Sequence, residues 1–145
     1  MTNKDKKSYL QKAYYLDKQI TCDTDELEQL RAMKNNLKGI DYSKERVQES
    51  GSANASYTRI VDKIVDLELK LLKDIDKMLE IRAEISEVIS KLDNLNERLV
   101  CKYRYLQFKK WDDIADMMHM TDRHVKRIHK SAISNIFIKD VTKCH

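Results

Sequence analysis

The chain has 145 residues and a formal net charge of +4, with 28 Lys and Arg against 24 Asp and Glu. Charged residues make up 36% of the sequence and aromatic residues 7%, which argues against a large globular core. There is no proline to interrupt helices, and the periodic apolar residues argue against disorder. We therefore expect an all-α fold, in one domain or in a small domain with an appendage.

The first predicted element is a helix over residues 5–38, marked by an apolar stripe. The stripe consists of Leu10, Ala13, Leu16, Ile20, Leu27, Leu30, Met33 and Leu37. It lapses at residues 21–25, where a helix break or an exposed turn within the helix would both fit; we favour one long helix. Tyr9, Tyr14 and Tyr15 suggest a base-stacking platform, but no basic groove accompanies them. We expect them to pack at one end of the helix.

Residues 39–56 are predicted to form the one extended loop, because both glycines lie there, at Gly39 and Gly51. Gly39 suits the position that follows the last turn of a helix. The small, polar stretch Glu49–Ser56 lacks both the GxxxxGK[ST] order and a flanking strand. Nucleotide binding by this loop is therefore not expected.

Residues 57–92 form the most regular predicted helix. Its apolar residues recur at steps of three and four: Ile60, Ile64, Leu67, Leu71, Ile75, Met78, Ile81, Ile85, Val88 and Leu92. A stutter between Leu71 and Ile75 would locally unwind a coiled coil. A charged helix of this length needs a partner for its stripe. We expect a long antiparallel coiled-coil helical hairpin over residues 1–93, built from helices 5–38 and 57–92.

Residues 94–145 are predicted to form a second domain of three helices. Asn94 and Glu97 have the spacing of a capping box, which predicts a helix over about residues 95–106. Its apolar residues are expected to pack beneath the two helices that follow: Leu95, Leu99, Tyr103 and Leu106. Residues 107–110 form the connector to those helices.

A helix-turn-helix pattern occupies residues 111–136. Ala115 offers a small side chain where two crossing helices would approach most closely, a turn follows at 119–121, and Thr121 suits the N-cap of the second helix. The buried stripe of that helix is predicted at Val125, Ile128 and Ala132. We interpret Trp111 as a core residue rather than a base-stacking one. The order of these features is typical of the two-helix DNA-binding unit.

The second helix of this pattern carries basic residues opposite its apolar stripe. Four of them share an arc of about 100°: Arg123, Lys126, Arg127 and Lys130. A major groove admits such a helix and is walled by phosphates, although a solvated basic face is the simpler alternative. The predicted DNA-binding residues are this arc together with His124, Lys109, Lys110 and Thr121. Residues 95–145 hold 11 Lys and Arg against 6 Asp and Glu, so the positive charge lies in this region.

Five segments carry a more specific pattern: Leu99-Val100, Tyr103-Arg104-Tyr105, Trp111–Ala115, Thr121–Ile128 and Ala132-Ile133. This pattern resembles region 4 of bacterial sigma factors. It is still more similar to phage-encoded transcription regulators of the ArpU/RinA type, which share that module. The earlier segments that fit the same family are Tyr9-Leu10, Leu16-Asp17, Ile20, Glu26-Leu27 and the helix at 60–92.

The resemblance implies a regulator of late prophage genes that binds double-stranded DNA in the cytoplasm of a bacterial host. RNA polymerase is then an expected partner, and the coiled coil predicts a homo-oligomer. One position departs from the pattern, since such turns usually hold Gly where this chain has His119. We therefore expect His119 to tolerate a positive φ.

Two other functions are consistent with the sequence. A phage small terminase, the DNA-packaging subunit, would also join a helix-turn-helix to an oligomerising coiled coil. A pure interaction protein would instead use the helix-turn-helix to bind protein. An enzyme is not expected, because no nucleophile elbow, metal-ligand cluster or isolated acid–base pair is present. No cofactor or metal follows from the sequence.

The cysteines and the hydropathy pattern bear on location. Cys22, Cys101 and Cys144 show no CxxC pairing, which suggests free thiols in a reducing cytoplasm. The longest apolar runs span only a few residues, so no membrane partner is expected.

Overall fold

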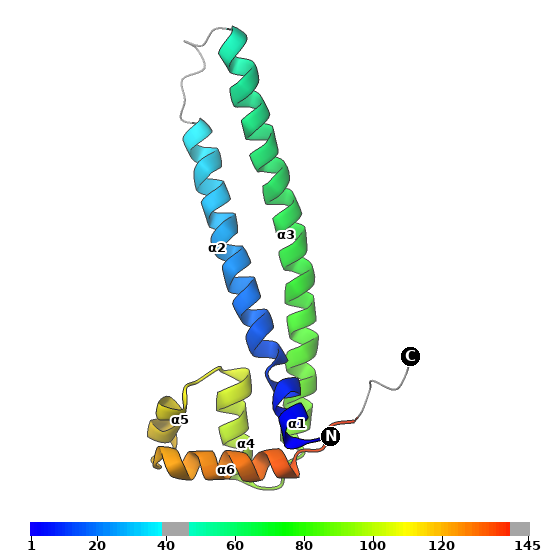
Figure 1. Ribbon diagram of the computed structural model, residues 1–145, viewed down its shortest axis with the longest axis vertical. Helices are drawn as coiled ribbons and strands as arrows, with labels where there is room; N and C mark the ends of the chain where they lie inside the picture. Colours follow the sequence, from blue (N-terminus) through cyan, green and yellow to red (C-terminus); the bar gives the residue numbers. More distant parts are fainter. Residues whose placement is uncertain (39–46, 140–145) are drawn as a thin grey trace. The chain divides into compact units, whose positions relative to one another are not determined.

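The computed structural model describes residues 1–38 and 47–139. Within these ranges the chain is helical and contains no strand, which confirms the all-α class. The elements are α1 (Asn3–Leu10), α2 (Lys12–Lys38), α3 (Val47–Ser90), α4 (Leu95–Cys101), a π-helical turn (Lys102–Leu106), α5 (Trp111–Met118) and α6 (Asp122–Asn135) (Figure 1).

The chain divides into two compact units. One comprises Met1–Asp17 and the chain from Met78 onward; the other is Lys18–Lys77. The first helical residues of the chain therefore belong to the same unit as α4, α5 and α6. The sequence predicted a different division, into a hairpin over residues 1–93 and a DNA-binding domain over residues 94–145. That division stays a prediction.

The prediction of one helix over residues 5–38 is wrong at Gln11, where α1 ends and from which α2 departs. The Gln11 N–H still bonds to the Lys7 carbonyl at 2.9 Å, so the interruption is a single non-helical residue. Residues 21–25, where a break was considered, are helical within α2. Local propensity does not mark Gln11 as a break, whereas α1 packs against an element that is distant in sequence.

That packing is against the C-terminal part of α6, beside which α1 lies in Figure 1. The Lys6 ammonium donates to the carbonyls of Ile133 and Ser134, at 3.1 and 3.3 Å. These carbonyls lie in the last turn of α6, where the helix dipole favours a cation. Leu10 closes α1 with a fully buried side chain. A contact across about 130 residues of chain thus sets the direction of the first helix.

The predicted loop at 39–56 is wrong for residues 47–56, which form the first turns of α3. One Gly within a helix costs only about 1 kcal/mol relative to Ala, and no proline is present to stop the helix. Extension of an existing helix gains a hydrogen bond for each residue fixed. The predicted helix at 57–92 therefore runs from Val47 to Ser90. The role predicted for Gly39 lies outside the described residues.

In the Lys18–Lys77 unit, α2 and α3 pack through one apolar cluster. Its buried residues are Leu27, Ile60, Ile64 and Leu71, and Ile20, Leu30, Leu37 and Leu67 pack around them. A polar layer adjoins this cluster, because Lys70 bonds to Asp23 and, at 3.3 Å, to Asp74. The part of α2 in which the apolar stripe lapses, residues 21–25, therefore makes a charged contact with α3 instead of an apolar one. Beyond the stutter, Ile75 is 43% exposed, which corrects its assignment to the seam.

The second cluster joins α4, α5 and α6. Its buried residues are Val100, Ile114, Ala115 and Val125, with Tyr103, Trp111, Met118, Met120 and Ile128 packed around them. The predicted inner face of the first helix is partly wrong, since Leu95 is 60% exposed. Glu97 and Tyr105 are buried in its place. An apolar pattern cannot find this face, because one of its members is a carboxylate.

Candidate nucleic-acid interface

The turn between α5 and α6 is fixed by its own backbone hydrogen bonds. His119 has φ 55° and ψ 46°, the left-handed conformation expected for a position usually held by Gly. Its N–H bonds to the Asp116 carbonyl at 3.3 Å, and the Met120 N–H bonds to the Ala115 carbonyl at 2.9 Å. This pair of bonds is a Schellman motif, which satisfies carbonyls left over at the end of α5. The turn therefore holds its shape without glycine.

Thr121 begins α6 as predicted. Its hydroxyl accepts a hydrogen bond from the His124 N–H at 3.2 Å, which satisfies one of the free amides of the first turn. Val125 and Ile114 are fully buried one turn further in, where α6 meets α5. The start of α6 is therefore held at a definite position by both a cap and a core contact. A contact of Thr121 with DNA stays a prediction.

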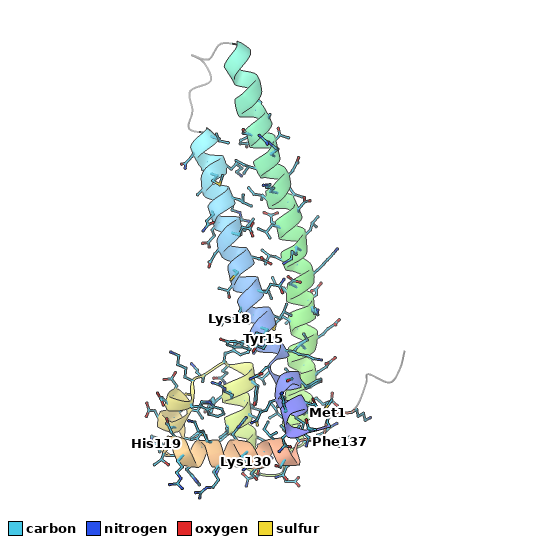
Figure 2. The ribbon with its side chains drawn as sticks, in the orientation of Figure 1. Met1, Tyr15, Lys18, His119, Lys130 and Phe137 are labelled. Atoms are coloured by element: carbon cyan, nitrogen blue, oxygen red, sulfur yellow. The ribbon has the colours of Figure 1, made fainter. Side chains whose placement is uncertain are left out.

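The side chains of α6 divide between an apolar face and a basic face. The buried ones are Val125, His129, Ala132 and Ile133. All five basic residues predicted on this helix are exposed: Arg123, His124, Lys126, Arg127 and Lys130. Figure 2 labels His119 at the junction of α5 and α6, and Lys130 further along α6. Before α5, Lys110 is exposed and Lys109 is half-buried.

Carboxylates limit the basic face at the N-terminal end of α6. Asp122 shares a hydrogen bond with Asp112 of α5, and this raises the pKa of the Asp122 carboxyl above its ordinary value. Repulsion from Asp112 and Asp116 acts in the same direction, whereas Lys126 opposes it. These three carboxyl groups make the N-terminal end of α6 less positive than the exposed face further along the helix.

The His129 side chain of α6 packs against Tyr105 and Trp111, which come from two other elements. The His129 ring is 7% exposed, its Nε2 lies 2.5 Å from the Tyr105 hydroxyl, and its centroid lies 4.7 Å from that of Trp111. Burial, with the nearby charges of Lys7 and Arg104, lowers the pKa of His129 to about 4. The ring is therefore neutral at pH 7. This packing agrees with the interpretation of Trp111 as a core residue.

Glu97 is also a buried polar side chain, although its spacing from Asn94 suggested a part in a capping box. Asn94 caps α4 as predicted, accepting from the Glu97 N–H at 3.1 Å. The Glu97 carboxylate, however, accepts from the Ser131 hydroxyl at 2.7 Å and from the Asn135 amide at 3.2 Å. It thereby ties α4 to the exposed side of α6. Nothing in the sequence marks this role, because Glu97 stands between two polar residues, Asn96 and Arg98.

The two cysteines of the described residues differ in exposure. Cys22 is exposed in α2, whereas Cys101 is fully buried in α4, and both are free. Burial raises the pKa of Cys101 to about 12, so its thiol is protonated and unreactive at pH 7. Cys144 lies outside the described residues.

Comparison of the chain with protein-family models, with curated proteins and with solved structures found no match. Among the described residues, no helix combines the length and the apolar character needed to span a lipid bilayer. The interpretation of the site accordingly rests on its residues and their geometry.

Proposed function

We propose that the chain is a sequence-specific DNA-binding transcription regulator in which α4, α5 and α6 form a sigma region 4-like helix-turn-helix. The observation that carries this proposal is the division of α6. Its Arg and Lys side chains and His124 are exposed, Val125, Ala132 and Ile133 are buried on the opposite face, and a rigid turn fixes its start. A helix presented in this way fits a major groove, whose width matches a helix with its side chains.

The roles of the basic residues follow from their position along α6. We assign Arg123 and Arg127 to base edges, because a guanidinium offers two parallel donors to guanine O6 and N7. Lys126 and Lys130 contact phosphates, with help from His124. Lys109 and Lys110 directly precede α5, and we assign them further phosphate contacts.

Helices α2 and α3 form, in this proposal, an antiparallel coiled-coil hairpin that associates with a second copy. Its support is a row of apolar side chains on α3 that stays outside the cluster with α2: Val65, Leu69, Leu72 and Ile75 are 43–60% exposed. The row recurs at steps of three and four, the spacing of a coiled-coil seam. RNA polymerase is the other partner proposed for the hairpin.

The setting proposed for this activity comes from the resemblance to ArpU/RinA-type regulators. It is the cytoplasm of a bacterial host, at promoters of phage late genes. Chromatin pull-down of the tagged chain followed by sequencing tests it, with a variant carrying alanine at all four arc positions as control. Peaks at a late promoter that vanish in the variant support the proposal.

The same experiment separates the alternatives. A single peak at a packaging site, with rings of eight or more copies in solution, would favour a small terminase. Identical profiles for the parent and the variant would contradict DNA binding by α6 and favour an interaction protein.

A further inference from the structure

A hollow of about 470 Å³ lies beside the basic face of α6, and α1 forms one of its walls. Its lining comes from segments far apart in the sequence that belong to the same compact unit. Four cationic side chains line it, Lys7, Arg104, Lys126 and Lys130, together with the amides of Asn3 and Gln11. None of the described residues that line it is acidic.

The four cationic side chains of the hollow form few hydrogen bonds or ion pairs with other described residues. Arg104 is held by a hydrogen bond to the Lys109 carbonyl at 3.0 Å and lies 4.5 Å from the Trp111 ring centroid. A guanidinium has five N–H donors, so most of its hydrogen-bonding capacity remains available. Among the described residues, no ion pair is formed by Lys7 or Lys130. Like charges gathered without an acid repel each other, and a bound anion would relieve that repulsion.

Neutral side chains also line the hollow. His129 and Trp111 contribute to the lining. The charges of Lys7 and Arg104 add to burial in lowering the pKa of His129, so both cations act on the same small volume. The ring stays neutral at pH 7, and no further charge is added. A site with fixed cations, amide donors and an aromatic wall has the chemistry of an oxyanion site.

Two of the four cations also belong to the basic arc of α6. Lys126 and Lys130 are four residues apart, about one helical turn, and both line the hollow. The hollow is therefore continuous with the surface proposed to enter the major groove. A phosphate backbone at the edge of that groove would pass over it.

We propose that this hollow binds a phosphate group, supplied by the backbone of the DNA that α6 reads, which makes α1 part of the DNA-binding surface. The source of the phosphate rests on the proposed function, whereas the chemistry of the hollow does not. Lys7 and Arg104 thereby join the residues that contact nucleic acid. Neither was predicted from sequence, because Lys7 comes near α6 only through the docking of α1.

The test compares Lys7→Ala with Lys4→Ala. Both changes remove one exposed positive charge from α1, but only Lys7 lines the hollow. Affinity for a 30-base-pair duplex is measured as a function of salt concentration for the full chain. We expect Lys7→Ala to lower the slope of log affinity against log salt by about one unit, and Lys4→Ala to change it by less than roughly 0.3. Lys7→Arg should restore the parent slope. Equal slopes for the two alanine variants would overturn the proposal.

A second measurement separates failure of the hollow from failure of the proposed function. Trp111 is the only tryptophan of the chain and lines the hollow, so its fluorescence reports on occupancy. Inorganic phosphate is titrated at constant ionic strength, with chloride as the replaced anion. If the parent binds no DNA, the proposed function fails. A saturable emission change that Lys7→Ala removes and Lys4→Ala keeps would then support a site for free phosphate. No saturable change in a parent that binds no DNA would overturn the phosphate site as well.

Discussion

The Lys18–Lys77 unit and the α4–α6 part of the chain are both helical, but they bury their side chains to different degrees. In the former, the buried apolar residues Leu27, Ile64 and Leu71 keep 6–7% of their surface exposed, and Lys70 forms a charged layer beside them. In the latter, Val100 and Ile114 are completely buried. Its buried polar side chains are held by hydrogen bonds to neighbouring elements.

This difference agrees with the functions proposed for the two parts. Ion pairs as exposed as Arg31–Glu68 contribute little to stability. The packing of α2 against α3 therefore depends on their small apolar cluster and on any partner that covers the exposed apolar residues. The α4–α6 part instead fixes the helix that carries the exposed cations. A rigid platform limits the entropy lost when side chains bind DNA, while a weaker hairpin with an apolar row suits assembly.

The largest expected effect comes from placing a carboxylate in each unit. Ile85 is 1% exposed in the unit that contains α4–α6, whereas Leu67 is half-buried in the other. Ile85→Asp should prevent folding, since a buried carboxylate without a partner is very costly. Leu67→Asp can still reach water and should leave a folded chain that melts earlier. Circular dichroism melts of both variants check this, and equal effects would remove the contrast between the units.

Truncation of a core side chain should show the same contrast without introducing charge. Ile114→Ala removes a fully buried side chain and should lower the free energy of unfolding by about 2–5 kcal/mol. Ile128, which the sequence placed in the buried stripe, is only half-buried, so the loss of stability from Ile128→Ala should lie at or below the low end of that range. Ile75→Ala, at an exposed position, should cost less than about 0.5 kcal/mol. Urea denaturation would rank the three, and any other order would contradict the described packing.

His129 should make the stability of the α4–α6 part depend on pH. Its native pKa of about 4 lies below the ordinary value of 6.5, so the unfolded chain binds more protons between these limits. The contribution is fully present above pH 6.5 and is lost as the pH falls toward 4. It amounts to about 2 kcal/mol between pH 7 and 5. His129→Gln should lack this dependence, so the stability difference between parent and variant should change over that range; a constant difference would contradict it.

The exposed row on α3 should affect assembly and leave the fold unchanged. Leu69 and Leu72 are 55% and 60% exposed, so their joint replacement by Asp should shift the unfolding free energy by less than about 1 kcal/mol. If a second copy covers this row, the double variant should sediment as a monomer. Arg59→Ala, at an exposed position of α3, is the control. A double variant that sediments like the parent would place the interface elsewhere.

Periodicity predicted α5, α6 and most of α3, because their buried faces are set by apolar residues close in sequence. The left-handed His119 and the Thr121 cap were also predictable, since both depend on backbone chemistry within one turn. The inner face of α4 was not, because Glu97 is buried through hydrogen bonds to residues more than 30 positions away. The break at Gln11 likewise depends on a distant element, α6.

The same contrast between features set by nearby residues and features set by distant ones applies to the proposed site. The arc of α6 follows from helix geometry alone, and its four basic residues, with His124 beside them, are exposed as the pattern requires. The hollow beside it could not be predicted, because Lys7 and Arg104 are brought together by the docking of α1. The helical start of α3 was missed because small polar residues were interpreted as a loop, although a single glycine does not end a helix.

The central claim is that α6 reads DNA, and one binding measurement tests it most directly. Arg123, Lys126, Arg127 and Lys130 are replaced together by alanine, and affinity for the best-bound duplex is measured at low salt. The matched control removes four exposed charges from α3: Arg59, Lys63, Lys73 and Lys77.

The account predicts that the α6 variant loses well over tenfold in affinity, since even one base contact is worth about 1–3 kcal/mol, while its melting temperature barely changes. The control should lose much less. An α6 variant that binds within about threefold of the parent, or no more weakly than the control, would contradict the claim that this helix reads DNA.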